Sequence, residues 1–281
     1  MSLISKSSII PEKSISILAD THVHTEFSGD SSAPVRSQIE KALSLGMKEL
    51  CITDHHDPDA PSDINFTLNL NQYVSAIQSL QSEYQARIAL RLGIELGLQL
   101  HIAPKLQQIT ESYPFDYIIG SNHFVDRMDP YFPAYFEGKT EEEGYRRYFE
   151  STLERIQAIP DFDVLGHLDY VVRYGPNKNR NYSYNKYQDL IDPILKNLVE
   201  TGRGLECNTG GYKYGLGHPN PTEEILKRYL ELGGEIITIG SDAHDPVHLA
   251  FDFARAKKVL TGLGFRYYAV YYHRRPHFYP L

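Results

Sequence analysis

Short runs of β-forming residues alternate with longer helical patterns along the whole chain, and this alternation constrains the fold more than any other feature. The same rhythm continues from the first run to the last. Alternating strands and helices are typical of a parallel sheet or barrel. The sequence predicts seven strands, at residues 17–22, 49–53, 91–96, 116–121, 163–167, 204–207 and 235–240, and residues 267–272 resemble an atypical eighth.

The segments between the strands show the apolar spacing of helices that cover such a barrel. Leu70, Val74, Ile77, Leu80 and Tyr84 recur at helical intervals and predict one apolar stripe. Similar amphipathic patterns occupy residues 141–159, 186–200 and 222–232.

A Tyr- and Asn-rich stretch at residues 173–187, which contains Pro176, interrupts the rhythm and predicts a long functional loop. Otherwise no repeat, low-complexity segment or linker divides the chain. We therefore expect one domain over residues 1–281, with residues 1–14 as an irregular N-terminal extension.

Charge and composition exclude several classes of protein. The formal net charge of -8 argues against a protein that binds nucleic acid by neutralising many phosphates. Cys51 and Cys207 lack C-x-x-C spacing and read as reduced core residues of a cytoplasmic protein. No apolar run has the length of a signal peptide or a membrane span, so we expect no membrane partner. The oligomeric state stays open.

Histidines and acidic residues lie at the ends of nearly all the predicted strands. In (β/α) barrels these positions converge on the face that carries the active site. The clusters are Asp20-Thr-His22-Val-His24, Thr53-Asp-His-His56, Gly93-Ile-Glu95, Ser121-Asn-His123, Gly166-His-Leu-Asp169 and Ser241-Asp-Ala-His244.

This pattern predicts a metal centre. His22 and His24 point the same way because strand side chains alternate, so they can hold one ion together. A single H-x-H pair is usually incidental, but six clusters in register with strand ends are not. Imidazoles mixed with carboxylates favour zinc, iron or manganese over calcium. By the same reasoning five histidines are expected not to be ligands: His56, His101, His248, His273 and His277.

These motifs resemble those of the polymerase-and-histidinol-phosphatase (PHP) superfamily, in the same order from residue 20 to residue 244. The resemblance is greatest to the histidinol-phosphatases and then extends over almost the whole chain. It rests further on Phe27-Ser-Gly-Asp30, Glu206-Cys-Asn-Thr209, His218-Pro-Asn-Pro221 and Arg274-Arg-Pro276. It implies an α/β fold, a distorted (β/α)7 TIM-like barrel, with two or three divalent metal ions.

The resemblance also implies which residues hold the ions. One ion would be held by His22, His24, Glu95 and Asp242, and Glu95 would bridge to a second ion held by His123 and His167. Asp30, His55 and His244 would hold a third ion. Some relatives have histidine in place of Asp30, so a weaker third site, or one for a harder metal, is expected.

The remaining site residues would serve phosphate-ester hydrolysis by a metal-bound hydroxide, with no protein nucleophile. The absence of a P-loop and of a G-x-S-x-G elbow agrees with this. Arg173 is predicted to grip phosphate, while Glu206, Asn208 and His218 are candidate substrate contacts. Asp20 and Asp54 either support ligands or handle a proton, or are structural caps.

The expected reaction is hydrolysis of L-histidinol phosphate to L-histidinol and phosphate, a step of histidine biosynthesis. A PHP phosphoesterase acting on another small phosphorylated metabolite or on a phosphodiester is the nearest alternative. An amidohydrolase-type C–N hydrolase also begins with H-x-H on a barrel strand, but Glu95 stands where those enzymes usually have a bridging lysine. A non-catalytic metal-binding module is the last alternative.

Overall fold

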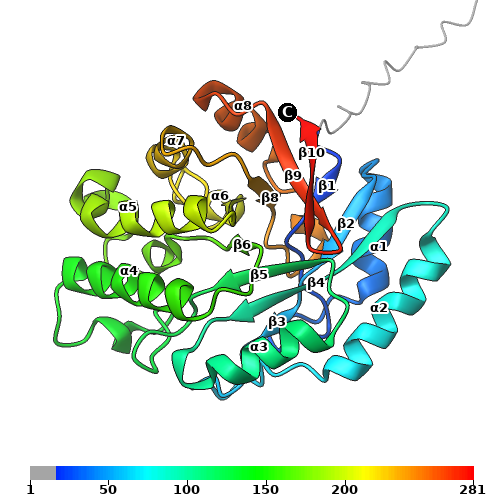
Figure 1. Ribbon diagram of the computed structural model, residues 1–281, viewed down its shortest axis with the longest axis horizontal. Coiled ribbons are helices and arrows are strands. Elements are labelled where there is room, and N and C mark those ends of the chain that lie inside the picture. Colours follow the sequence, from blue (N-terminus) through cyan, green and yellow to red (C-terminus); the bar gives the residue numbers. More distant parts are fainter. Residues whose placement is uncertain (1–16) are drawn as a thin grey trace, which may run out of the picture.

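The computed structural model describes residues 17–281 and contains a barrel of parallel strands surrounded by helices (Figure 1). Each strand pairs with the next one along the path. The seven strands on this path are β1 (Ala19–Asp20), β2 (Glu49–Ile52), β4 (Ala89–Gly97), β5 (Tyr117–Ser121), β6 (Val164–Leu165), β7 (Gly204–Asn208) and β8 (Ile237–Gly240). The short β3 (His55–His56) pairs in parallel with the carboxyl-terminal part of β4, where His55 lies opposite Glu95.

The barrel is nearly closed between the segments that follow β1 and β8. The amide of Asp242 donates to the His22 carbonyl over 2.9 Å, and the amide of His24 donates to the Ala243 carbonyl over 2.9 Å. Since β1 and β6 are only two residues long, the barrel is distorted. The predicted α/β fold, a distorted seven-stranded barrel, is confirmed.

The helices follow the strands and cover the outside of the barrel. On α2 (Leu70–Tyr84) the predicted stripe is buried except for Leu70, which is only partly buried. Tyr73 joins it, and its hydroxyl shares one hydrogen between the carbonyls of Gly93, at 2.8 Å, and Ile52, at 3.0 Å, which ties the helix to two strands. The other helices are α1 (Val35–Ser44), α3 (Ala103–Ser112), α4 (Glu141–Ala158), α5 (Tyr184–Glu200), the single turn α6 (Gly210–Lys213), α7 (Glu223–Glu231) and α8 (Phe253–Leu263).

The predicted long loop is shorter and more ordered than expected. Two 3-10 helices, Tyr170–Arg173 and Lys178–Asn181, occupy much of it, and α5 already begins at Tyr184. Tyr182 packs against Tyr145, Phe149 and Tyr187. This tyrosine-rich packing, which sequence periodicity does not detect, explains the difference. The other 3-10 helices are Leu100–Ile102, Pro133–Phe136 and Pro246–His248.

The predicted eighth strand exists but does not extend the barrel. β9 (Tyr267–Tyr272) forms an antiparallel hairpin with β10 (Arg275–Pro280). The hairpin lies against the amino ends of the strands, where Arg274 Nε donates to Asp163 over 2.7 Å and the Arg274 amide donates to the Asp116 carbonyl over 2.9 Å. It therefore covers the face opposite the strand ends that carry the histidines.

Two further predictions concern the N-terminal residues and membrane-spanning helices. The predicted irregular extension at residues 1–14 lies outside the described residues. Among the helices of residues 17–281, none combines the length and the apolar character that crossing a bilayer requires.

Candidate metal centre

The nine predicted ligands come together at the carboxyl ends of the strands, around Glu95 on β4. Glu95 Oε2 lies 3.2 Å from His22 Nε2 and 3.4 Å from His24 Nε2, both in the segment after β1. Its other oxygen, Oε1, lies 3.2 Å from His123 Nε2 and 2.8 Å from His167 Nε2, which follow β5 and β6. Glu95 thus stands between two groups of imidazoles, as a bridging carboxylate would.

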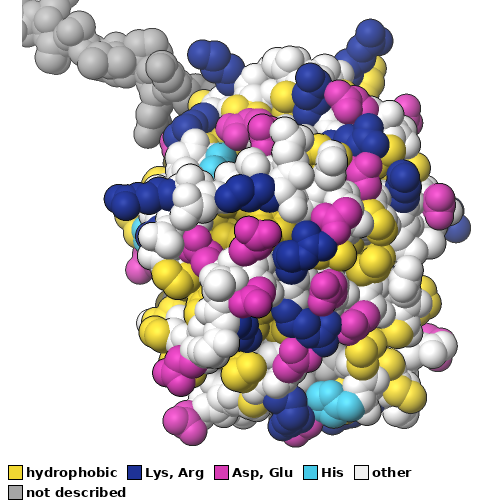
Figure 2. Space-filling view, turned by 90° about the vertical axis from the view of Figure 1, so that its left-hand side faces the viewer, with side chains coloured by type: hydrophobic (Ala, Val, Ile, Leu, Met, Phe, Trp, Pro, Cys, Tyr) yellow, Lys and Arg dark blue, Asp and Glu magenta, His cyan; other side chains and the backbone are white. Residues whose placement is uncertain are grey.

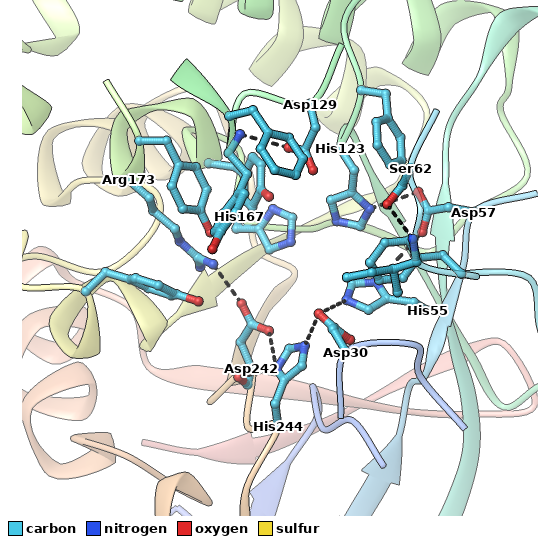
Figure 3. A pocket seen from close by; sticks show the side chains of 18 residues that line it. Asp30, His55, Asp57, Ser62, His123, Asp129, His167, Arg173, Asp242 and His244 are labelled. Carbon is cyan, nitrogen blue, oxygen red and sulfur yellow. Dashed lines mark hydrogen bonds and ion pairs between the residues drawn. The ribbon is translucent and has the colours of Figure 1, made fainter. Parts of the chain in front are cut away.

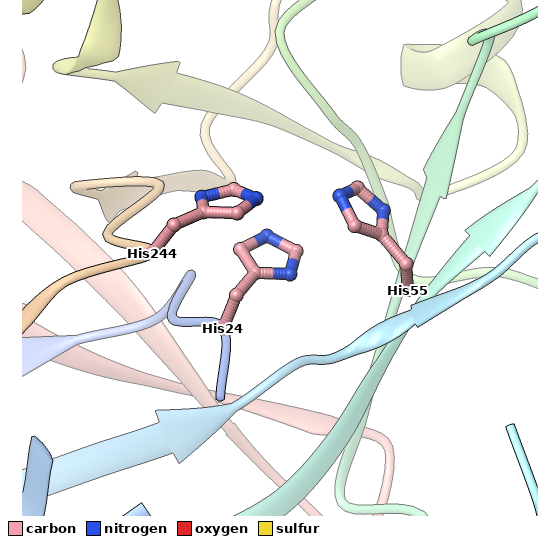
Figure 4. Close-up of side chains that lie close together, drawn as sticks. All are labelled: His24, His55 and His244. Carbon is pink, nitrogen blue, oxygen red and sulfur yellow. The ribbon is translucent and has the colours of Figure 1, made fainter. Parts of the chain in front are cut away.

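A third group lies on the open side of the centre, where the rings of His24, His55 and His244 face one another (Figure 4). The His24 ring centroid lies 4.2 Å from that of His55 and 4.0 Å from that of His244. Asp30 Oδ2 is 3.2 Å from His244 Nε2 and 3.7 Å from His55 Nε2. Asp30 and His244 are less buried than the other ligands, so this is the most accessible group.

The hydrogen bonds behind the imidazoles show that the donor set suits a cation. His22 Nδ1 donates to Glu206 over 2.6 Å, and His24 Nδ1 donates over 3.0 Å to Ser28, whose hydroxyl donates to Asp54. The Nε2 atoms of both rings then face each other at 3.0 Å and lie close to Glu95 Oε2. A proton or a metal ion shared by these atoms would satisfy this arrangement.

The same arrangement recurs at His123, through a residue that the sequence reasoning missed. His123 Nδ1 donates to Asp57 over 3.0 Å, so Nε2 is the ring atom that faces the Glu95 carboxylate. Asp57 is fully buried and directly follows the T-D-H-H motif, which was the available signal. A side chain at Gly97 would collide with it, so only glycine permits this approach.

Electrostatics favour ionised carboxylates at the centre. Burial opposes ionisation of Glu95 and Asp242, but His22 and other cationic neighbours hold both pKa values well below the usual range. Burial lowers the pKa of His24 and of His167, so these two rings are neutral donors. At His22 the effect of burial is outweighed by Glu206, Glu95 and Asp242, which raise its pKa and mark a place that attracts positive charge.

Arg173 lies in the wall of the cavity above the centre (Figure 3). Its guanidinium donates to Asn220 over 2.8 Å, to Asp242 over 2.9 Å and to Asn208 over 3.0 Å. Of the five N–H donors of this guanidinium, two make no hydrogen bond to residues 17–281. Tyr214 lies under the guanidinium, 4.8 Å away.

Two residues that fix this arginine were not singled out in the sequence. Asn220 donates its amide to Asp169 over 2.6 Å, and Asp169 also accepts the amide of Thr222 over 3.1 Å. All three side chains are buried. Asn220 and Asp169 belong to the H-P-N-P and G-H-L-D motifs, but no local pattern shows that they meet Arg173.

Three residues predicted as substrate contacts, Glu206, Asn208 and His218, are not among those that line the cavity. Glu206 binds the His22 ring and accepts the amide of His167, while Asn208 holds Arg173. His218 is buried, with Nδ1 2.7 Å from the Pro219 carbonyl. Glu206 and Asn208 thus contact other site residues: two ligand segments in the case of Glu206, and Arg173 in the case of Asn208.

Asp20 and Asp54 differ in role. Asp20 accepts the amides of Ser241 and Ala250 over 3.0 and 2.9 Å, which makes it a structural cap of the segment after β8. Asp54 accepts from Thr25 and Ser28 and so acts on His24 through a hydroxyl. The five histidines that were expected not to be ligands lie outside the cavity lining, and His56 accepts the Leu68 amide.

Comparison with known proteins finds similarity to PHP domains and to histidinol-phosphatases. The family model described as PHP domain matches residues 20–210. The chain is 31% identical to a histidinol-phosphatase of Lactococcus lactis, over 90% of this chain and 93% of that protein. A histidinol-phosphatase of Bacillus subtilis is 24% identical, over 80% of this chain and 92% of the relative. The crystal structure of the histidinol phosphate phosphatase from Lactococcus lactis, complexed with zinc, L-histidinol and phosphate, has a TM-score of 0.86 and 30% identity, covering 92% of this chain and 98% of that one.

Proposed function

Because this chain belongs to the PHP-domain family, we infer that it is a metal-dependent phosphomonoesterase, a histidinol-phosphatase. The observation that carries this inference is the set of imidazole nitrogens and carboxylate oxygens that face one another beneath Arg173. The Lactococcus lactis structure, which holds zinc, L-histidinol and phosphate, supports this inference, because the two chains share one fold over 92% of this chain and 98% of that one. The reaction releases L-histidinol and phosphate, and we place it in histidine biosynthesis.

We propose that two or three divalent ions, zinc, iron or manganese, occupy the centre. The proposed ligand sets are His22, His24, Glu95 and Asp242 for the first, and Glu95, His123 and His167 for the second, with Asp30, His55 and His244 for the third. When bound, such ions lower the pKa of a water molecule and neutralise charge on the phosphoryl oxygens.

The side chains of the protein have separate tasks in this proposal. Arg173 binds two phosphoryl oxygens with its free N–H groups and is held in place by Asn208, Asn220 and Asp242. Glu206, Ser28 and Asp57 fix the tautomers of the imidazoles. No serine or cysteine nucleophile is needed. A cytoplasmic location and a small phosphorylated metabolite as the only partner complete the proposal.

The first experiment measures phosphate release from L-histidinol phosphate, p-nitrophenyl phosphate and a mononucleotide after loading with manganese, zinc or iron. We expect a strong preference for L-histidinol phosphate. The variant His123→Ala should lose turnover on all three substrates, because it lacks one imidazole facing Glu95. The matched control His101→Ala removes an exposed histidine and should keep full activity. Equal, weak activity on the three substrates would contradict the substrate assignment.

A further inference from the structure

The cavity above the metal centre is lined by four carboxylates, and one of them differs from the others in its partners. Asp30 pairs with His244 at 3.2 Å, Asp57 with His123 at 3.0 Å and Asp242 with Arg173 at 2.9 Å. Within residues 17–281, Asp129 makes no ion pair. Its carboxylate accepts only the backbone amide of Tyr131, over 2.8 Å (Figure 3).

The surroundings of Asp129 make an unpaired carboxylate costly. Asp129 is half-buried, and burial raises its pKa although His123 and His55 oppose the shift. The rings of Phe124, Phe132 and Tyr170 line the same cavity. Aromatic faces attract cations and do not compete with a carboxylate for them. This part of the cavity is therefore suited to a cationic group.

The cavity wall carries a negative charge at Asp129 and a positive charge at Arg173. Figure 3 shows the two side chains apart, with His167 labelled between them. Arg173 offers donors to a phosphate. L-histidinol phosphate carries a phosphate at one end and nitrogen groups at the other, an amine and an imidazole, each of which can carry a positive charge. The polarity of the cavity matches the polarity of this substrate.

We propose that Asp129 binds a cationic nitrogen of the leaving alcohol, the amine or the imidazole, and so selects phosphate esters that carry such a nitrogen over neutral phosphate esters. This inference rests on the proposed function and adds a specificity-determining residue to it. The orientation of the carboxylate is set by its bond to the Tyr131 amide, which leaves the other oxygen for the substrate.

The test is the variant Asp129→Asn, which removes the charge and keeps an oxygen for the Tyr131 amide. The kcat/KM for L-histidinol phosphate should fall about tenfold or more, mostly through KM, because a charge-assisted hydrogen bond is lost. The kcat/KM for p-nitrophenyl phosphate, which has no cationic group, should stay unchanged. Asp126→Asn is the matched control, since Asp126 lies in the same loop, is exposed, and pairs with Arg147 outside the cavity.

Two analogues identify the nitrogen that is recognised. One is the phosphate ester without the amine, and the other is a 2-amino alcohol phosphate without the imidazole. The unmodified protein should prefer the analogue that keeps the recognised cation, and Asp129→Asn should lose that preference. Equal loss on p-nitrophenyl phosphate, or no loss on L-histidinol phosphate, would overturn the role of Asp129. Failure of the unmodified protein to prefer L-histidinol phosphate would instead contradict the proposed function.

Discussion

At the scale of single residues, the side chains behind the ligands decide which nitrogen of each imidazole faces the centre. Ser28 is the clearest case, because its one hydroxyl accepts from His24 Nδ1 and donates to Asp54. It also accepts the amide of His55 over 3.0 Å. A small uncharged side chain thus connects two ligands to a buried carboxylate.

Replacing Ser28 by alanine should weaken metal binding about tenfold to a hundredfold, as loss of a partner behind a ligand usually does. The His24 ring would lose the acceptor that fixes its tautomer. Metal content after dialysis against a graded chelator measures this effect. Ser44→Ala, at an exposed serine on α1, is the control. Equal metal retention in the two variants would contradict the role of Ser28.

Arg173 depends on its neighbours in the same way. Asn220→Ala removes the acceptor of Arg173 Nε and also leaves Asp169 without one donor. We expect kcat/KM to fall about tenfold for L-histidinol phosphate and p-nitrophenyl phosphate alike, since the phosphate is common to both. The inhibition constant of inorganic phosphate should rise in parallel. Asn71→Ala, at an exposed amide on α2, should change neither. A loss restricted to one substrate would argue against a phosphate-positioning role.

At the scale of elements, the β9–β10 hairpin separates stability from catalysis. It lies on the amino side of the strands, away from the metal centre. Arg274 pairs there with Asp163, at 2.7 Å, and with Asp161, at 2.9 Å. Asp163 is buried, so removal of the arginine would leave a buried carboxylate without its cationic partner.

Arg274→Ala should therefore lower the free energy of unfolding by about 2 kcal/mol, the usual loss for hydrogen bonds to a charged group. The kcat of the folded enzyme should stay unchanged. Urea unfolding followed by circular dichroism gives the first quantity, and a phosphate-release assay gives the second. Arg275→Ala changes an exposed arginine of the same hairpin and should leave stability unaltered. A drop in kcat without loss of stability would contradict this assignment.

At the scale of the whole molecule, the metal centre joins segments that close the barrel. His22 and His24 follow β1, and Asp242 and His244 follow β8, the two ends of the strand path. An ion held by His22, His24 and Asp242 would tie these ends together in addition to the backbone bonds.

Removing the metal should consequently destabilise the barrel as a whole. A metal that binds only the folded state raises the free energy of unfolding by about 4 kcal/mol when its free concentration is a thousandfold above Kd. For a protein of this size, that corresponds to a rise of roughly 10 °C in Tm. Thermal unfolding before and after chelation measures the shift, and added zinc or manganese should reverse it. His123→Ala should show a smaller shift. An unchanged Tm after verified metal removal would contradict this coupling.

Much of this organisation follows from the sequence by itself. The order of strands and helices is a local property, because apolar periodicity reports which face of each segment is buried. Ligand types at successive strand ends indicate a shared metal centre, since parallel strands bring those ends to one face. The strand-end pattern predicted a metal centre, and the family resemblance implied the nine ligands.

Only the tertiary structure decided which residues stand behind the ligands. Glu206 bonds to His22 across 184 positions of sequence, and Arg274 reaches Asp163 across 111. Hydrogen bonds of this kind depend on a few ångströms of packing, which no local pattern encodes. For that reason the bonds of Glu206 to His22 and of Asn208 to Arg173 were not predicted, and Asp57, Asn220 and Asp169 were missed. The atypical eighth strand was predicted, but its antiparallel partner β10 was not, because strand periodicity does not specify the partner strand.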